Sequence, residues 1–239
     1  MPAIEPVTEV SPGVFRIHFF GKNYLAAFSG RQFPNDKHTE LLNALGIKEE
    51  HLCRVKQVHG NRVIAASEAG LLPARVEADG LFTNQAAIAL GIMTADCVPV
   101  FFVDPVCRVI GLAHAGWRGI YAGIVQEMIK ALEKRFSTRP ENLQVIFGPS
   151  IRKCCYEVGP EFRDYFPGYY YEGSVPSGRR RCVDLTGAIS ALLFTQGILP
   201  EHLCDTQICT SCQNNRFFSV RKDRGSPERI LSILQISSF

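Results

Sequence analysis

Three short apolar runs between residues 86 and 113 constrain the fold of this chain more than any other feature. Ala86 to Met93, Val98 to Val103 and Arg108 to Ala113 each have the length and apolar character of a buried β-strand. The first two runs lie on either side of a polar turn, Thr94 to Cys97. We therefore expect these runs to be strands in the core of the molecule.

A long amphipathic helix is predicted directly after these strands. Apolar residues recur every four positions, and charged and amide side chains occupy the opposite side of the predicted helix. The apolar stripe consists of Ile120, Ile124, Met128, Leu132 and Phe136, widened by Val125 and Ile129. A single amphipathic helix of this kind buries one face against a sheet.

The remaining segments mix strands and helices. Strands are predicted at 13–20, 23–28, 143–147 and 217–220, with shorter ones on either side of a turn at 59–61, and helices at 38–45 and from Asp184 to Gly197. No internal repeat or low-complexity segment interrupts them. The fold class is therefore mixed α/β or α+β, in one domain over residues 1–239.

Composition excludes several classes of protein. With 46% hydrophobic and 21% charged residues, the chain is able to build a large core, which argues against disorder. A net charge of +3 is too small to predict nucleic-acid binding, and we interpret Arg179 to Arg181 as a solvated loop. No apolar stretch of membrane-spanning length occurs, so we expect no contact with a membrane.

The expected location is the cytoplasm. The acidic, proline-containing start of the sequence lacks the basic and then apolar pattern of a signal peptide. Nine cysteines, an odd number, would then be reduced thiols that serve as core residues, ligands or nucleophiles.

The segment HAGWRG, residues 114–119, is the first candidate site. His114 follows a predicted strand, where loops commonly carry functional side chains. The two glycines permit a sharp turn and a close approach to a ligand. Arg118 at the start of a helix suits an anion, and Trp117 offers an aromatic wall to a flat ligand.

Two residues upstream extend this site into a metal-binding hypothesis. Cys97 follows Asp96 between two apolar strands, and His59 lies in the segment QVHG. Two imidazoles and a thiolate, with a fourth position open, describe a catalytic zinc site. The intervals between them are longer than in zinc fingers, so ordinary roles remain open: a small core cysteine, a hydrogen-bonded histidine and an arginine paired with a carboxylate.

A series of motifs favours the metal hypothesis over these ordinary roles. In chain order they are QVHG, EADGLFTN, TADCVPVFFVD, HAGWRG, GPSIRKCCYEVG, CT and FFSVRKD. This series, over roughly residues 52 to 222, resembles the laccase-domain family, also called the YfiH or multicopper polyphenol oxidase family. The resemblance implies a mixed four-layer α/β/β/α sandwich similar to the catalytic domain of cytotoxic necrotizing factor. It also implies a zinc ion held by His59, Cys97 and His114.

The same resemblance implies an enzyme of purine nucleosides. The implied reactions are phosphorolysis of adenosine, inosine and methylthioadenosine, and deamination of adenosine, with nucleoside and phosphate as partners. A zinc ion in a three-ligand site lowers the pKa of its bound water and so supplies hydroxide for attack on purine C6. We assign catalytic roles to Cys97, His114, Asp96 and Arg118, with Asp79 as an alternative to Asp96 in proton transfer.

Substrate contacts are assigned from residue type and position. Arg31, Arg118 and Arg221 are candidates for an anion site near the ribose, and Trp117 for stacking on the base. The segment at 27–33, AFSGRQF, departs from the threonine-arginine-glycine-glycine stretch usual in the family, which affects specificity if it lines the pocket. We interpret the adjacent pair Cys154 and Cys155 as packing near a strand end.

Four other interpretations are considered. Six histidines are too few for a trinuclear copper cluster with a blue copper site, although the three-ligand site suits a single copper ion. Cys97 and His114 without metal would suit a cysteine hydrolase, and a bacterial branch of the family resembles a peptidoglycan editing factor. A binding module without activity leaves the clustered cysteine, histidine and arginine without a role. Residues 202–212 also suggest a zinc knot, formed by His202, Cys204, Cys209 and Cys212.

Overall fold

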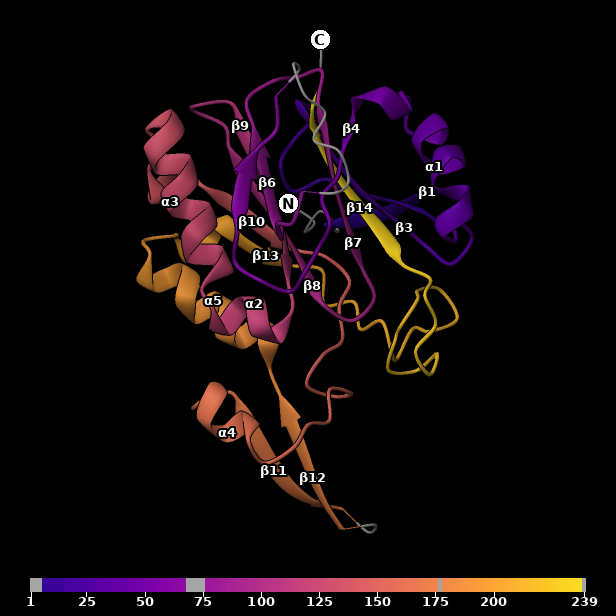
Figure 1. The fold of residues 1–239 in the computed structure, drawn as a ribbon, viewed down its shortest axis with the longest axis vertical. Helices are drawn as coiled ribbons and strands as arrows, with labels where there is room; N and C mark the ends of the chain where they lie inside the picture. Colours follow the sequence, from indigo (N-terminus) through magenta and orange to yellow (C-terminus); the bar gives the residue numbers. More distant parts are fainter. Residues whose placement is uncertain (1–5, 68–75, 176–177, 238–239) are drawn as a thin grey trace, which may run out of the picture.

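A computed structural model describes residues 6–67, 76–175 and 178–237 (Figure 1). Two six-stranded sheets and a separate hairpin contain its strands. The first sheet has the order β1 (Val7–Ser11), β2 (Val14–Ile17), β3 (Tyr24–Ser29), β14 (Ile230–Ile236), β7 (Ala89–Thr94) and β4 (Leu52–Cys53). The second has the order β13 (Leu203–Asp205), β10 (Gln144–Phe147), β8 (Val98–Asp104), β9 (Val109–Ala115), β6 (Gly80–Thr83) and β5 (Val63–Ala65).

The two sheets pack face to face, and helices cover their outer sides. Side chains from both sheets, including Phe28, Leu90, Phe101 and Leu112, form one buried cluster between them. On the outer side of the second sheet lie α2 (Trp117–Tyr121), α3 (Ile124–Phe136) and α5 (Leu185–Thr195), whereas α1 (His38–Ala44) packs on the first sheet (Figure 1). The mixed α/β fold class is confirmed; the likeness to the toxin domain stays a prediction.

Burial on both faces explains the apolar strands. Every residue of β8 and β9 is buried, because one face of their sheet meets the other sheet and the opposite face meets the helices. Strands covered on both sides are continuous apolar runs rather than alternating ones. Of the described helices, none is long and apolar enough to cross a membrane.

A hairpin projects from this body. Strands β11 (Tyr170–Val175) and β12 (Gly178–Val183) pair antiparallel, and the short helix α4 (Phe162–Tyr165) lies beside them (Figure 1). Arg179 to Arg181 belong to β12 and not to a loop. Two of these arginines, Arg179 and Arg181, form ion pairs with Glu172 on the opposite strand.

Two other sequence predictions differ from the structure, and one central strand was not predicted. The predicted helix is two helices, because Gly123 has a left-handed φ of 89° between α2 and α3. The predicted strand at 217–220 is irregular chain, although Phe217 and Phe218 are buried. The strand without a sequence prediction is β14, which pairs with both β3 and β7 at the centre of its sheet.

Candidate metal and substrate site

The hairpin of β8 and β9 brings the first two candidate residues together. In its register Val98 pairs with Ala115 and Pro99 with His114. Cys97, directly before β8, therefore lies beside the end of β9 that carries His114. His114 is buried, whereas Cys97 is partly exposed.

Asp79 orients His114. Its Oδ1 lies 2.7 Å from His114 Nδ1, and the carboxylate is fully buried. The backbone N–H of His114 also donates to the carbonyl of Asp79, at 2.7 Å. With Nδ1 bound in this way, the Nε2 of His114 is the nitrogen left for a ligand, as in carboxylate–histidine–metal arrangements.

The same carboxylate holds the loop of His59. The backbone N–H groups of Val58, His59 and Gly60 all donate to Asp79, at 3.2, 2.9 and 2.7 Å. Burial alone would raise the pKa of Asp79, but the hydrogen bonds from His114 and Gly60 make the net shift a lowering. Asp79 is therefore an ionised anchor shared by two candidate ligands.

A glutamine and an unusual backbone complete the support of His59. The Gln57 amide donates to the carbonyl of Met93 at 2.7 Å and accepts from its N–H at 2.8 Å, which fixes the loop against the end of β7. His59 and Asp96 have left-handed φ values of 61° and 90°, which are uncommon for residues other than glycine. Such backbone strain concentrates at functional sites.

The three candidate ligands meet in space. The ligand atoms of His59, Cys97 and His114 all lie within 4.8 Å of one another, and the two imidazole rings are 4.7 Å apart between centroids. Burial opposes ionisation of Cys97, yet hydrogen bonds and charge from His114 and His59 lower its pKa to about 6. Despite the opposing effect of burial, hydrogen bonds to Asp79 and Cys97 raise the pKa of His114 to about 9.

Two glycines lack the side chains that would fill the space in which these ligands meet. A Cβ atom at Gly116 would lie 3.0 Å from both Cys97 Sγ and His59 Cδ2. At Gly119 a Cβ atom would lie 2.8 Å from the carbonyl oxygen of Gly60, where α2 contacts the loop of His59. The glycines of HAGWRG therefore make room for the neighbouring loops.

Asp96 connects the site to two distant segments. Its Oδ1 accepts from the Thr210 hydroxyl at 2.7 Å, its Oδ2 from the backbone N–H of Arg221 at 2.8 Å, and its carbonyl from the N–H of Ile151 at 2.9 Å. Both carboxylate oxygens thus have partners within the protein. These hydrogen bonds fit a role for Asp96 in holding the loops together better than a role in proton transfer.

Two hollows lie in this part of the structure, and the three ligands line one of them. One, of about 330 Å³, is lined by His59, Cys97 and His114 themselves, together with Arg229. The other, of about 470 Å³, is lined by the aromatic residues Trp117, Tyr156 and Phe162, by Arg221, and by Glu157, Val158 and Gly159. The Trp117 ring lies 5.0 Å from that of Phe162 between centroids. Burial, and secondly the charge of Cys97, raise the pKa of Tyr156 to about 12.

The predicted arginines have different surroundings. Arg118 is exposed, stacks 4.3 Å from the Trp117 ring and forms no ion pair within the described chain. Arg221 is exposed and lies over the Tyr156 ring. The Arg31 guanidinium instead contacts both oxygens of Asp223, at 3.0 and 3.1 Å, as well as two backbone carbonyls. Arg31 is outside both hollows, so a structural role describes it better.

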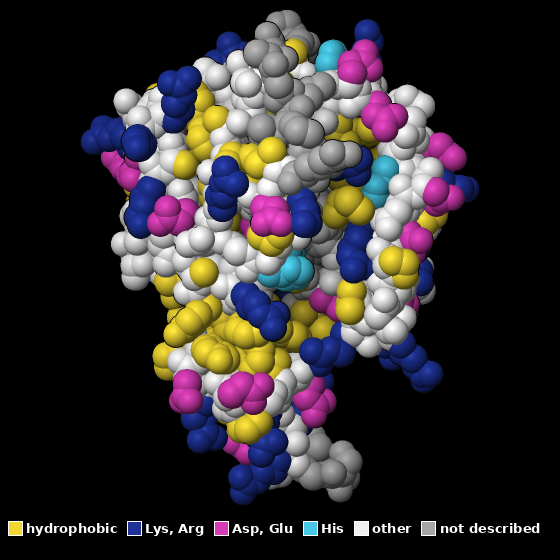
Figure 2. Space-filling model, in the orientation of Figure 1, with side chains coloured by type: hydrophobic (Ala, Val, Ile, Leu, Met, Phe, Trp, Pro, Cys, Tyr) yellow, Lys and Arg dark blue, Asp and Glu magenta, His cyan; other side chains and the backbone are white. Residues whose placement is uncertain are grey.

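Two contributors were not predicted from the sequence, and a third has a different role. Tyr156 and Arg229 line the hollows, and Asp79 orients a ligand where proton transfer was considered. Tyr156 lies in the motif GPSIRKCCYEVG, so the sequence did contain a signal that this residue belongs to the site. On the face shown in Figure 2, hydrophobic side chains gather just above the projecting hairpin, with basic side chains beside them.

Comparison with known proteins identifies the family. Residues 35–237 match the family model described as multi-copper polyphenol oxidoreductase laccase. The chain belongs to this family. The motif series quoted above thus led to the correct family.

Curated relatives carry names from purine metabolism. Purine nucleoside phosphorylase YlmD of Geobacillus stearothermophilus is 37% identical over 161 residues, which cover 65% of this chain and 59% of the relative. Purine nucleoside phosphorylase LACC1 of Homo sapiens is 32% identical over 194 residues, 77% of this chain and 43% of the relative. Adenosine deaminase RL5, from an unknown prokaryotic organism, is 29% identical over 78% of this chain and 76% of the relative. The chain therefore spans less than two thirds of the first two relatives.

A solved relative has the same fold. The crystal structure of YlmD from Geobacillus stearothermophilus superposes with a TM-score of 0.88 at 26% sequence identity, over 98% of this chain and 100% of that one. A hypothetical protein YfiH from Bacillus licheniformis gives the same TM-score at 24% identity. These superpositions agree with the packing of sheets and helices described above.

Proposed function

We propose that the chain is a zinc-dependent purine nucleoside enzyme, which phosphorolyses adenosine, inosine and methylthioadenosine and deaminates adenosine. The observation that carries this proposal is the convergence of His59, Cys97 and His114 within 4.8 Å, beside an aromatic hollow. The names of the relatives support the substrate class.

The donor set fits zinc. Two imidazoles and a thiolate with one position left for solvent or substrate are typical of catalytic zinc sites, and Asp79 provides the usual carboxylate behind a histidine ligand. When bound in such a site, zinc polarises substrate oxygen atoms and lowers the pKa of water toward neutrality. Of the six histidines only His59 and His114 lie in this group, which is too few for a trinuclear copper cluster with a blue copper site.

The surrounding residues suit the two halves of a nucleoside reaction. Trp117 and Tyr156 offer flat, apolar faces to a purine base. Arg118 and Arg221 are exposed cations beside these rings, which suits the phosphate that attacks the ribose. Asp96 holds the Arg221 segment in place by its hydrogen bond to the backbone.

The test compares adenosine turnover with and without phosphate. The protein is expected to form adenine and ribose 1-phosphate with phosphate, and inosine and ammonia without it. Both reactions should stop after treatment with a chelator and return with zinc alone. Arg118→Gln should raise the KM for phosphate about tenfold and leave deamination unchanged, a loss typical of one charged hydrogen bond. Arg163→Gln, on α4, is the matched control.

Two results would refute this proposal. One is turnover that survives complete removal of metal, and the other is a zinc-loaded protein without activity on any of the three nucleosides. An effect of Arg163→Gln equal to that of Arg118→Gln would refute the assignment of Arg118 alone.

One observation favours a second candidate, the metal-free cysteine hydrolase acting on amides of cell-wall precursors. A Cys97 pKa of about 6 and a His114 pKa of about 9 describe a thiolate and an imidazolium at neutral pH. Such a pair is the resting state of cysteine nucleophiles. It is equally the state in which a thiolate is ready to bind a metal.

Alkylation of Cys97 distinguishes these candidates. In metal-stripped protein the rate of its modification by iodoacetamide should rise about tenfold between pH 5 and 7 and then stay level to about pH 8, since the thiolate forms around pH 6. Cys107, whose pKa burial raises, should show no such plateau. Peptide mass spectrometry reads each site separately. Bound zinc should protect Cys97; equal modification in protein as purified would favour the hydrolase.

A further inference from the structure

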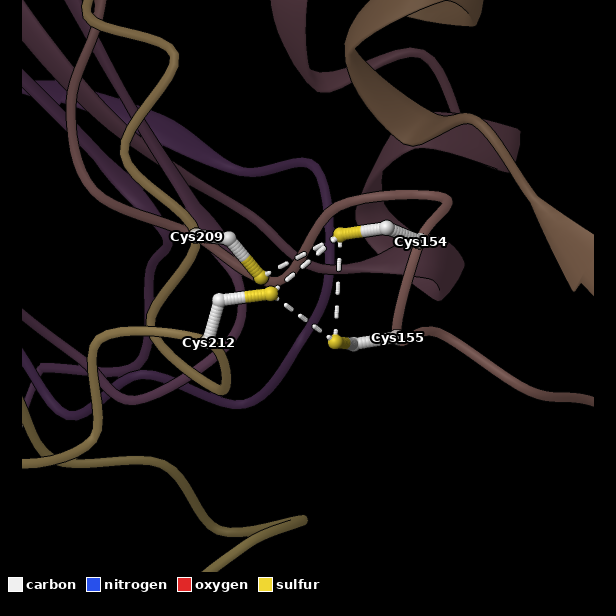
Figure 3. Close-up of side chains that lie close together, drawn as sticks. All are labelled: Cys154, Cys155, Cys209 and Cys212. Carbon is white, nitrogen blue, oxygen red and sulfur yellow. Dashed lines mark hydrogen bonds between the residues drawn. The ribbon is translucent and has the colours of Figure 1, made fainter.

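Four cysteines outside this site converge on one point. Cys154 and Cys155 lie in the loop after β10, and Cys209 and Cys212 lie in the loop after β13 (Figure 3). Their sulfur atoms all lie within 4.8 Å of one another. The sulfurs face each other from two segments more than 50 residues apart, so the cluster results from the tertiary fold.

Three of the distances between the sulfurs are close to the edge length of a coordination tetrahedron, and a fourth is shorter. Cys154 Sγ lies 3.8, 3.7 and 3.6 Å from the sulfurs of Cys155, Cys209 and Cys212, and Cys155 Sγ lies 3.3 Å from that of Cys212. A tetrahedron with metal–sulfur bonds of about 2.3 Å has edges of about 3.8 Å. A disulfide would require a separation of about 2.0 Å.

Backbone contacts hold the two loops in this arrangement. Ser150 and Cys209 form a parallel bridge, in which the Ser150 N–H donates to Ile208 and the Thr210 N–H donates to Ser150. The Arg152 guanidinium donates to the Asp205 carboxylate at 2.7 Å and to the Ile208 carbonyl at 3.2 Å. These contacts do not involve the thiols, so they hold the two loops together independently of any ligand on the sulfurs.

We propose that Cys154, Cys155, Cys209 and Cys212 form a second metal centre, which binds one zinc ion through four thiolates. Four protein ligands leave no open position, which is the arrangement of a structural rather than a catalytic zinc site. The centre shares no residue with the His59, Cys97 and His114 site. It replaces the predicted zinc knot, since Cys204 and His202 are not among its residues, and it gives Cys154 and Cys155 a role beyond packing.

The centre would connect to the substrate site through its own loops. Thr210, between two of the ligands, donates its hydroxyl to Asp96, and Tyr156 follows Cys155 directly in the sequence. Tyr156 lines the aromatic hollow. A metal ion across the two loops would therefore fix both Asp96 and one wall of the hollow.

Counting bound zinc in the full-length protein tests the proposal. Wild type is expected to bind two zinc ions, whereas His59→Asn and Cys212→Ser should each bind one and the double variant none. Cys204→Ala, in the same segment but outside the cluster, should still bind two. Cys212 is exposed, so its replacement by serine places little strain on the core.

X-ray absorption at the zinc edge of His59→Asn protein gives an independent measurement that does not require any cysteine variant to fold. Four sulfur neighbours at about 2.3 Å are expected. The proposal is overturned if this variant holds no zinc, if its zinc has nitrogen neighbours, or if these cysteines are found in disulfides in the protein as purified. Unchanged nucleoside turnover in this variant, with the four-sulfur signal retained and the other zinc ion lost, would overturn the proposed function alone.

Discussion

His59→Asn and Cys97→Ser are each expected to remove the catalytic zinc and to lower adenosine turnover about a thousandfold. A metal that polarises a reacting oxygen contributes several kcal/mol to the transition state, and about 4 kcal/mol corresponds to this factor. Turnover at saturating adenosine and zinc content by atomic emission are the two measurements. Both reactions, phosphorolysis and deamination, should fall together if one ion serves both.

These two substitutions preserve the backbone and the shape of the site. Asparagine adopts the left-handed conformation that His59 has, with its φ of 61°, more readily than alanine does. Serine has nearly the shape of Cys97 but is a poor zinc ligand. His114 is the less suitable position, because its removal would leave the buried carboxylate of Asp79 without its imidazole partner.

His18→Asn is the matched control, because His18 is exposed and its side chain contacts only the Thr8 hydroxyl among the described hydrogen bonds. It should retain full zinc content and activity. Unchanged turnover in His59→Asn or Cys97→Ser, with the zinc lost, would separate metal binding from catalysis and so contradict the proposed function.

The strands and helices that sequence pattern predicted are those whose local sequence and tertiary surroundings agree. Runs buried on both faces, such as β8 and β9, have few alternatives to a strand. The predicted single helix failed at Gly123, since the apolar stripe continues across a residue whose φ is not helical. The sequence from Phe217 to Val220 is typical of a strand, but this segment is irregular and pairs with no strand. Its aromatic side chains are nevertheless buried in the core.

The site could be predicted only through the motif series. Spacing along the chain does not bring His59 to Cys97; Asp79 and Gln57 do so, by hydrogen bonds across other strands. Contacts between distant segments likewise determine which cysteines form the four-cysteine cluster. Cys204 is closer in sequence to Cys209 than Cys154 and Cys155 are, yet Cys204 is not in the cluster. The bridge between Ser150 and Cys209 brings Cys154 and Cys155 to Cys209.

Asp79→Asn is expected to weaken zinc binding at the His59, Cys97 and His114 site by 10- to 100-fold, the usual cost of losing a carboxylate behind a histidine ligand. All four groups that hydrogen-bond to the Asp79 carboxylate are N–H donors: the His114 ring and the backbone of residues 58–60. A carboxylate accepts all of them, whereas an asparagine directs its own N–H₂ group at one side of the set. Either the imidazole or the loop of His59 then loses its acceptor.

Competition with a chromogenic chelator measures this affinity, and Asp104→Asn provides the control. Asp104 is as deeply buried, and its Oδ1 likewise accepts two backbone N–H groups, but it lies at the opposite end of β8 from Cys97. The measurement also decides between the two roles considered for Asp79. A positioning residue changes zinc affinity, whereas a proton-transfer residue would leave the affinity intact and lower turnover alone. Because the carboxylate is fully buried and all its contacts are within the protein, we expect the affinity to fall and excess zinc to restore most of the activity.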